Sequence, residues 1–252
     1  MTSKRYVSFS LYGDKDIYNC GAVENAKLIP KVLPGWRATF FLGVSVSESL
    51  ERKLQSLGAM TLRINESETP IAMTWRFRAA YLDEVSHILF RDCDSRITKR
   101  EVSCIQQWLN SGKSYHIIRD HPWHASPIMG GLWGVSGSSE IEYIRSMLNG
   151  NLLDFVDDYG LDQKLVSEYV YPRAIEFGNY FVHDAFRSRE RGRMRPPPRK
   201  EGAFMGERIL CDGSHNQADR QVVISHENSW LRRLALVLND ALFLLNQLRS
   251  KK

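Results

Sequence analysis

Two aspartates, Asp92 and Asp94, stand two residues apart, directly after an apolar run at residues 88–90. In an extended segment, residues i and i+2 point to the same side, so both carboxylates can face one point. Two bare carboxylates resist this arrangement unless a cation lies between them. A hard divalent ion such as Mg²⁺ or Mn²⁺ takes oxygen ligands and brings substrate phosphates with it. The pair therefore predicts a metal and phosphate site; an aspartate turn that caps the following helix is the alternative.

A second polar cluster, which includes Asp120 and His124, follows the next apolar run, at residues 115–118. Ligands of open α/β sheets bind beyond the carboxyl ends of the strands, so two such clusters on neighbouring strands indicate one site. His124 fits either a ligand role or that of a packed, hydrogen-bonded histidine. Gly130 and Gly131 come next, and a ligand can approach their backbone closely because glycine has no Cβ; a tight turn is the alternative.

The elements that must position these residues alternate between strand and helix patterns, as in an α/β sheet. Strands are expected at residues 6–11, 38–44, 60–64, 88–90 and 115–118. Helices are expected at residues 22–32, 47–57, 71–83 and 98–110. The helix at residues 98–110 begins with a capping box of Thr98 and Glu101. This order places the two aspartates at the end of the fourth strand.

The second half of the chain is less regular. Helix patterns appear at residues 141–148 and 162–171, followed by a basic, proline-rich loop and a polar stretch at residues 212–229. A last amphipathic helix is expected at residues 231–248, where leucines recur at steps of three and four. We expect one α/β domain, in which residues 1–186 carry the site and residues 187–252 are a loop and an amphipathic helix appended to it.

The basic charge of the chain belongs to one segment. Residues 187–200 hold six arginines, one lysine and one glutamate, a net +6; the whole chain carries +5, so the other 238 residues sum to −1. A near-neutral body without a basic, aromatic-rich sheet face argues against nucleic-acid binding. The segment is expected to be a solvated, mobile run of charge. Contact with an anionic acceptor, or with a membrane surface together with residues 230–252, is the alternative.

Cysteine usage bears on the compartment. The four cysteines are scattered and form no Cys-x-x-Cys pair; they are Cys20, Cys93, Cys104 and Cys211. They are expected to be free thiols in a reducing compartment. No apolar run approaches the roughly 18 residues that span a bilayer, and the first residues lack a signal-peptide apolar region. We therefore expect a cytoplasmic location, with peripheral contact to the inner face of a membrane as the alternative.

Several segments together resemble a family of glycosyltransferase-like proteins of the GT-A fold, found in bacterial and large-virus polysaccharide gene sets. They are FSLYGD, NCGAVENAKLIPKVLPGW, WRF, FRDCDSR, KREVSCIQQWL, IIRDHPWHASPIMGGLWG and HDAF, and the likeness covers about residues 5–186. The resemblance implies a Rossmann-like α/β fold with a mostly parallel central sheet flanked by helices. It also implies an enzyme that uses Mn²⁺ or Mg²⁺ to move a sugar from a UDP- or GDP-type nucleotide-sugar to a glycan or another hydroxyl acceptor.

The resemblance also implies roles for individual residues. Asp92 and Asp94 would bind the metal and the donor diphosphate, Arg76 would contact the donor, and Arg78 is the second choice. His183, in Val-His-Asp, would be the third metal ligand. The other implied positions are Ser8 and Tyr12 for the base and ribose, Asp120 near the donor sugar, Gly130 and Gly131 beneath that sugar, and Asp162 and Gln163 at the acceptor.

The chain departs from the retaining members of this fold, which usually carry a His-x-x-Gly-x-x-Lys-Pro motif that is absent here. His183 therefore follows from its order in the chain, and the stereochemical outcome stays open. An inverting enzyme would need a base for the acceptor hydroxyl, and the candidates are Asp120, His121, His124 and Asp162. The alternatives are a GT-A scaffold without catalysis and a haloacid-dehalogenase-type phosphotransferase. The latter normally carries its two aspartates on the first strand.

Overall fold

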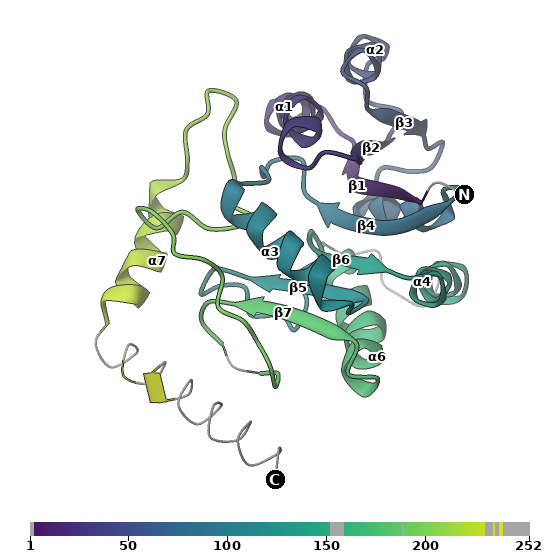
Figure 1. The fold of residues 1–252 in the computed structure, drawn as a ribbon. Coiled ribbons are helices and arrows are strands. Elements are labelled where there is room, and N and C mark those ends of the chain that lie inside the picture. Colours follow the sequence, from purple (N-terminus) through teal and green to yellow (C-terminus); the bar gives the residue numbers. More distant parts are fainter. Residues whose placement is uncertain (1–2, 152–158, 188, 230–233, 235–236, 239–252) are drawn as a thin grey trace.

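The computed structural model describes residues 3–151, 159–187, 189–229, 234 and 237–238. In this part of the chain, seven strands form one sheet in the order β3-β2-β1-β4-β6-β5-β7, with β6 antiparallel to β4 and β5 and the other neighbours parallel (Figure 1). The strands are β1 (Lys4–Leu11), β2 (Trp36–Leu42), β3 (Met60–Arg63), β4 (Val85–Arg91), β5 (Tyr115–Arg119), β6 (Leu132–Ser136) and β7 (Tyr180–Asp184). The predicted α/β fold with a mostly parallel sheet is confirmed.

Helices cover both faces of the sheet because its strands are apolar on both sides. On one face, Val7, Phe9 and Leu11 of β1 pack against α1 (Asp16–Val32), α2 (Glu48–Ser56) and α3 (Lys99–Ser111). The opposite face packs against a second group of helices: η1 (Pro70–Tyr81), α4 (Ser138–Asn151), α5 (Leu161–Leu165), η3 (Val166–Val170) and α6 (Tyr171–Glu176). A further helix, α7 (Gln217–Asn228), lies at the edge of the domain (Figure 1).

Side-chain caps explain where two of the predicted helices begin. The hydroxyl of Ser47 accepts a hydrogen bond from the amide of Leu50 and starts α2, and the hydroxyl of Thr98 accepts one from the amide of Glu101 and starts α3. The capping box is only half formed, however. The Glu101 carboxylate turns inward and pairs with Arg91 at 2.6 Å, because both groups are buried and each needs a partner of opposite charge.

Four elements differ from the pattern of strands and helices predicted from the sequence. The helix expected at residues 71–83 is the 3₁₀ helix η1, and β6, β7 and α7 lie where this pattern assigned no strand or helix. The strand β7 was missed because it carries His183 and Asp184, which are fully buried and hydrogen-bonded. The helix α7 is mostly polar and begins at Asn216, whose side chain accepts from the amide of Ala218. The last helix, expected at residues 231–248, lies outside the described residues apart from 234 and 237–238.

The described part of the basic segment, 187 and 189–200, is partly packed onto the domain, which corrects its prediction as a run solvated throughout; residues 191, 195 and 200 are exposed as expected. Glu190 is buried against Arg119, and the side chain of Arg199, 6% exposed, lies between Asp120 and Glu227. The backbone of Met194 exchanges hydrogen bonds with the edge strand β7. The buried charges of this segment are tolerated because charges of opposite sign on the domain neutralise them.

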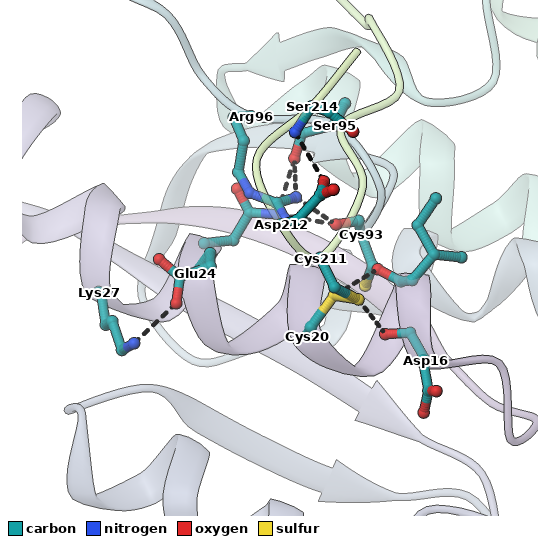
Figure 2. The surroundings of a disulfide bond; sticks show 12 residues. Asp16, Cys20, Glu24, Lys27, Cys93, Ser95, Arg96, Cys211, Asp212 and Ser214 are labelled. Atoms are coloured by element: carbon teal, nitrogen blue, oxygen red, sulfur yellow. Dashed lines mark hydrogen bonds and ion pairs between the residues drawn. A yellow bond between two sulfur atoms is a disulfide. The ribbon is translucent and has the colours of Figure 1, made fainter. Parts of the chain in front are cut away.

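Two of the four cysteines are not free thiols, which corrects the prediction. Cys20 on α1 and Cys211, 191 residues later, form a disulfide (Figure 2). Cys93 and Cys104 are free and buried. The pairing was missed because only the fold brings these two distant positions together. In the ranges that the structure describes, no helix has both the length and the apolar character needed to cross a bilayer.

Candidate functional site

The order of the strands reverses between β1 and β4, and a large cleft opens there. From β1 the chain proceeds outward through β2 and β3, whereas β4 lies on the other side of β1. Open α/β sheets bind ligands at this reversal, beyond the carboxyl ends of the strands. The cleft has a volume of about 1300 Å³. Ten of the predicted site residues line it: Tyr12, Arg76, Asp92, Asp94, His121, His124, Gly130, Gly131, Asp162 and Gln163.

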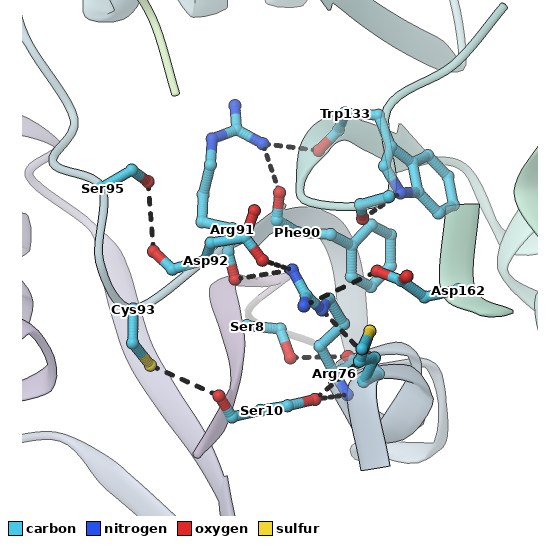
Figure 3. A network of polar contacts seen from close by, with 12 residues as sticks. Ser8, Ser10, Arg76, Phe90, Arg91, Asp92, Cys93, Ser95, Trp133 and Asp162 are labelled. Atoms are coloured by element: carbon cyan, nitrogen blue, oxygen red, sulfur yellow. Dashed lines mark hydrogen bonds and ion pairs between the residues drawn. The ribbon is translucent and has the colours of Figure 1, made fainter. Parts of the chain in front are cut away.

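Arg76 is the centre of the polar network in this cleft (Figure 3). Its Nη1 atom lies 2.6 Å from Oδ1 of Asp92, and its Nη2 atom lies 3.6 Å from Oδ2 of Asp162. Its side chain is only 6% exposed. Burial alone would lower the pKa of Arg76, but the charges of Asp92 and Asp162 outweigh burial and raise it. The guanidinium is therefore a fixed positive charge on the wall of the cleft.

Two serines of β1 hold Arg76 in place from below. The hydroxyl of Ser10 accepts from the amide of Arg76 and donates to the carbonyl of Met73, and the hydroxyl of Ser8 donates to the carbonyl of Arg76 at 2.6 Å (Figure 3). Ser8 is fully buried and does not line the cleft, which corrects its prediction as a base and ribose contact. It faces the same side of β1 as Ser10 but lies two residues further from the end of the strand, where the backbone of η1 at Arg76 covers it.

Tyr12 does line the cleft, at the end of β1. Its ring packs edge-on against the ring of Trp75, with centroids 5.7 Å apart. Burial raises the pKa of Tyr12 to about 12, so its hydroxyl stays protonated at neutral pH. The ring can offer an apolar face and the hydroxyl a hydrogen bond to a ligand in this part of the cleft.

Gly130 and Gly131 bring the acidic groups close to the backbone before β6. A Cβ atom on Gly130 would overlap the carboxylate of Asp162, and one on Gly131 would overlap the carboxylate of Asp92 and approach the Arg76 guanidinium to 2.7 Å. These positions therefore accept only glycine as long as the network keeps its geometry. In this structure the close approach to the two glycines is made by side chains of the site, and the approach of a ligand stays a prediction.

The two aspartates after β4 are suited to a divalent cation. Residues 91–97 alternate between buried and partly exposed, so Asp92 and Asp94 both face the cleft, with side chains 49% and 14% exposed. Burial and the neighbouring charge of Asp92 both raise the pKa of Asp94. No cluster of three or more His, Cys, Asp or Glu side chains is present in the described residues. Two carboxylates fit an ion such as Mg²⁺ when ligand phosphates supply further oxygens.

His183 does not reach this pair, which corrects its prediction as the third metal ligand. It lies on β7, three strands away from β4 in the sheet, and it is fully buried. Its Nδ1 atom is 2.9 Å from His116, and its Nε2 atom is 3.0 Å from the side-chain oxygen of Gln107. Both ring nitrogens are thus used inside the core.

Asp120 is likewise a core residue, which corrects its prediction as a donor-sugar contact. Its carboxylate is fully buried, pairs with Arg100 and with Arg199, and accepts from the amide of Met205 at 2.8 Å. It does not line the cleft. The residue follows β5, as predicted, but Arg100 of α3 and Arg199 occupy its carboxylate, and the contacts with Arg199 and Met205 connect the end of β5 to the C-terminal part of the chain.

Three further predicted residues line the cleft, namely His124, Asp162 and Gln163. Burial, together with the charges of His121 and Arg199, lowers the pKa of His124 to about 3, so this ring is neutral at pH 7. Its Nδ1 atom accepts from the amide of Asp120, and the amide of Gln163 donates to Ser126. Asp162 is the group that lies against Arg76, with its Oδ2 atom 3.6 Å from Nη2.

Two residues of this site received no role of their own from the sequence: Ser10, which lies inside the segment Ser8–Gly13 that the resemblance assigns to base and ribose, and Arg208. Ser10 could have been found, because it lies two positions after Ser8 on the same face of β1. Arg208 lies 3.2 Å from Asp94, although 114 residues separate them in the chain. No local pattern marks Arg208, which stands in a polar stretch without periodicity.

Comparisons with known proteins give matches among solved structures alone. No family model and no curated protein matches the sequence significantly. The chain is similar to a glycosyltransferase involved in the glycosylation of the major capsid of PBCV-1, with 18% identity, coverage of 73% of this chain and 83% of that chain, and a TM-score of 0.45. It is also similar to the galactosyltransferase LgtC in complex with donor and acceptor sugar analogues. Here the identity is 12%, the match covers 72% of this chain and 73% of that chain, and the TM-score is 0.48.

A third similar structure is glucosyl-3-phosphoglycerate synthase from Mycobacterium tuberculosis in complex with Mn²⁺, UDP and phosphoglyceric acid. It shares 11% identity with this chain, covers 75% of this chain and 72% of its own, and has a TM-score of 0.46. These identities are too low to transfer an activity to this chain, so its function is inferred from the residues of the cleft.

Proposed function

We propose that this chain is a metal-dependent glycosyltransferase, which moves a sugar from a UDP- or GDP-type nucleotide-sugar to a hydroxyl group of a glycan acceptor. One observation carries the proposal: buried Arg76 and the carboxylates of Asp92 and Asp94 meet at the strand reversal of a mostly parallel sheet. A cation and two acidic groups at this place suit a diphosphate and its metal ion. The resemblance of the sequence segments to the GT-A family supports the same function.

The donor diphosphate would be held between the metal ion and Arg76. Asp92 and Asp94 would hold Mn²⁺ or Mg²⁺, which as a Lewis acid stabilises the charge on the departing diphosphate. Arg76 contributes a positive charge that is already oriented before the ligand arrives, because its backbone is fixed by Ser8 and Ser10. Preorganised charge of this kind lowers the barrier most, since little reorganisation remains during the reaction.

Asp162 is the candidate for the group beside the reacting sugar. Its carboxylate lies against Gly130 and is 9% exposed, so it faces the deep part of the cleft. Burial raises the pKa of Asp162, while the charge of Arg76 opposes this shift. In an inverting reaction this carboxylate would accept the proton of the acceptor hydroxyl; in a retaining reaction it would stabilise positive charge on the sugar. Gln163 and neutral His124 supply hydrogen bonds around it.

A donor hydrolysis assay tests this function. The oxidised protein is incubated with UDP- and GDP-sugars in the presence of Mn²⁺, and the release of nucleoside diphosphate is measured with and without chelator. We expect release from one donor class, dependent on metal and reduced at least a hundredfold in Asp92→Asn. Release that is unaffected by chelator and by Asp92→Asn would contradict the proposal. A phosphoryl group on Asp92, seen by mass spectrometry, would instead favour the phosphotransferase.

A further inference from the structure

A segment from the C-terminal part of the chain lines the cleft beside Asp94. We call residues 204–216 the strap. At its start, Met205 is fully buried and its amide donates to Asp120. In its middle, the amide of Ile209 donates to the backbone carbonyl of Asp94 at 2.8 Å. The strap therefore lies directly beside the end of β4, between the core and α7.

The strap carries Arg208 into the cleft. The Nε atom of Arg208 lies 3.2 Å from Oδ2 of Asp94, while its side chain remains 58% exposed and lines the cleft. Arg76 approaches Asp92 from the buried side, and Arg208 approaches Asp94 from the solvent side. The two carboxylates thus lie between two guanidinium groups, and the outer one faces the space that the proposed ligand would fill.

A disulfide fixes the strap immediately after Arg208. Cys211 is bonded to Cys20, on the second turn of α1 (Figure 2). The helix α1 is itself packed on the sheet through Ala22, Ala26 and Ile29. Arg208 therefore lies close to two attachments, the Ile209 hydrogen bond to β4 and the disulfide to α1. Cys211 is exposed and Cys20 is partly buried, so a small reductant can reach the bond.

We propose that Arg208 binds the diphosphate of the donor, and that the Cys20–Cys211 disulfide holds it in position, so that donor affinity depends on the oxidation state of this pair. The inference rests on the proposed function. A metal ion that takes Asp94 frees the guanidinium of Arg208, whose planar fork pairs well with phosphate oxygens. Without the disulfide, the strap gains conformational freedom that ligand binding then has to remove.

The chemistry of the change is a two-electron reduction by a dithiol. Dithiothreitol attacks the disulfide as a thiolate, the bond between the two cysteine sulfurs breaks, and two cysteine thiols form while the reagent closes to its cyclic disulfide. Cys20 and Cys211 act only through the position of Arg208. They are positioning residues, and Arg208 is the residue that contacts the phosphate.

The test combines peptide mapping with calorimetry on the full chain. Mapping without reductant should recover the Cys20 and Cys211 peptides as one linked species. Binding of UDP, GDP and inorganic pyrophosphate with Mn²⁺ is then measured for wild type, Arg208→Gln and Arg208→Lys, each oxidised and reduced. We expect Arg208→Gln to raise the Kd of pyrophosphate and of the bound nucleotide about tenfold. Arg208→Lys should raise it less.

The coupling between the disulfide and Arg208 gives the decisive readout. Reduction should weaken binding about tenfold or less in wild type and have no further effect in Arg208→Gln, because the arginine through which the bond acts is then missing. Cys20→Ser/Cys211→Ser should behave like reduced wild type and ignore reductant. Arg52→Gln, an exposed arginine of α2 paired with Glu48, is the matched control and should bind like wild type.

The outcomes separate the two proposals. If a nucleotide binds to oxidised wild type but neither reduction nor Arg208→Gln changes its Kd, the inference is overturned and the proposed function stands. An equal effect of reduction in wild type and in Arg208→Gln would show a merely structural disulfide and also overturn it. If neither nucleotide nor pyrophosphate binds to oxidised wild type, the proposed function fails and the inference fails with it.

Discussion

The guanidinium of Arg76 lies 2.6 Å from the carboxylate of Asp92, and both groups rest on the backbone of Gly131. The three residues come from η1, from the end of β4 and from the turn before β6. Each element is fixed by a different part of the core, so the geometry of the pair depends on the whole sheet. Substitutions at residues that contact no ligand are therefore expected to affect donor binding, as are substitutions at residues that do.

Gly131→Ala should disable the donor site. The added Cβ would overlap the carboxylate of Asp92 and displace the Arg76 guanidinium, so the pair would separate. We expect donor affinity, measured by calorimetry with UDP or GDP and Mn²⁺, to fall at least tenfold, because a charge-assisted contact to phosphate is worth about 1.5–3 kcal/mol.

Gly150→Ala is the matched control for this substitution. A Cβ on Gly150 meets nothing within 4 Å, and the residue lies in α4. Alanine should therefore leave binding unchanged and raise the free energy of unfolding by up to about 1 kcal/mol. Wild-type affinity in Gly131→Ala would show that the Arg76–Asp92 pair does not shape the site.

Arg76→Lys should weaken donor binding although it keeps the charge. The single amino group of lysine cannot reach Asp92, Asp162 and the carbonyl of Met73 at once, as Nη1, Nη2 and Nε of Arg76 do at 2.6, 3.6 and 3.0 Å. We expect about a tenfold rise in the Kd of the nucleoside diphosphate. Arg78→Lys, at a partly exposed pair with Glu66 outside the cleft, should change that Kd by less than about twofold. Equal effects of the two substitutions would contradict the role given to Arg76.

Asp120→Asn should act on stability. The carboxylate neutralises Arg100 and Arg199, whose side chains are 14% and 6% exposed, and its loss leaves both charges without this partner. Breaking a buried pair on one side costs about 3–5 kcal/mol, which urea unfolding would measure. The folded fraction should bind the donor normally. Full stability together with lost donor binding would restore Asp120 to the site.

Stability should fall in acid because buried histidines cannot accept protons in the folded state. Burial, with the charge of Arg100, lowers the pKa of His183 to about 4, whereas an unfolded histidine titrates near 6.5. Between these values the unfolded chain binds the proton and the folded chain does not, so protonation favours unfolding. The stabilisation is complete above about pH 6.5 and is lost as the pH falls towards about 4, by roughly 1.4 kcal/mol per pH unit for each such group.

Urea unfolding of wild type and His183→Gln between pH 7 and pH 5 checks this expectation. The free energy of unfolding of the variant should fall less steeply as the pH is lowered. The difference between the two slopes should correspond to at most about one proton taken up on unfolding. The same slope in both proteins would mean that His183 does not titrate on unfolding in this range.

The sequence was sufficient to place much of the cleft because strand ends meet at one edge of the sheet. Asp92 and Asp94 follow β4, Tyr12 follows β1, and Arg76 lies on the helix between β3 and β4. Their positions follow from the order of elements, and the structure brings them together. Their roles in binding donor and metal stay predictions.

The remaining residues could not be predicted because the order of the elements does not show whether a side chain at a strand end is buried in the core or faces the cleft. Asp120 follows β5, but its carboxylate is paired with Arg100 and Arg199. His183 lies within β7, but its ring is hydrogen-bonded to His116 in the core. Arg208 and the Cys20–Cys211 bond depend on how the C-terminal part of the chain folds back over α1 and β4. Contacts across 114 or 191 residues leave no local pattern.

Calorimetry with UDP and GDP, with and without Mn²⁺, tests the central claim most directly. Wild type is compared with Asp92→Asn/Asp94→Asn, and circular dichroism confirms that both are folded. The account predicts that one nucleotide binds to wild type only when Mn²⁺ is present, and that the double variant does not bind it. Equal binding by both proteins, binding that ignores Mn²⁺, or no binding to wild type would contradict the assignment of this cleft as a metal-dependent donor site.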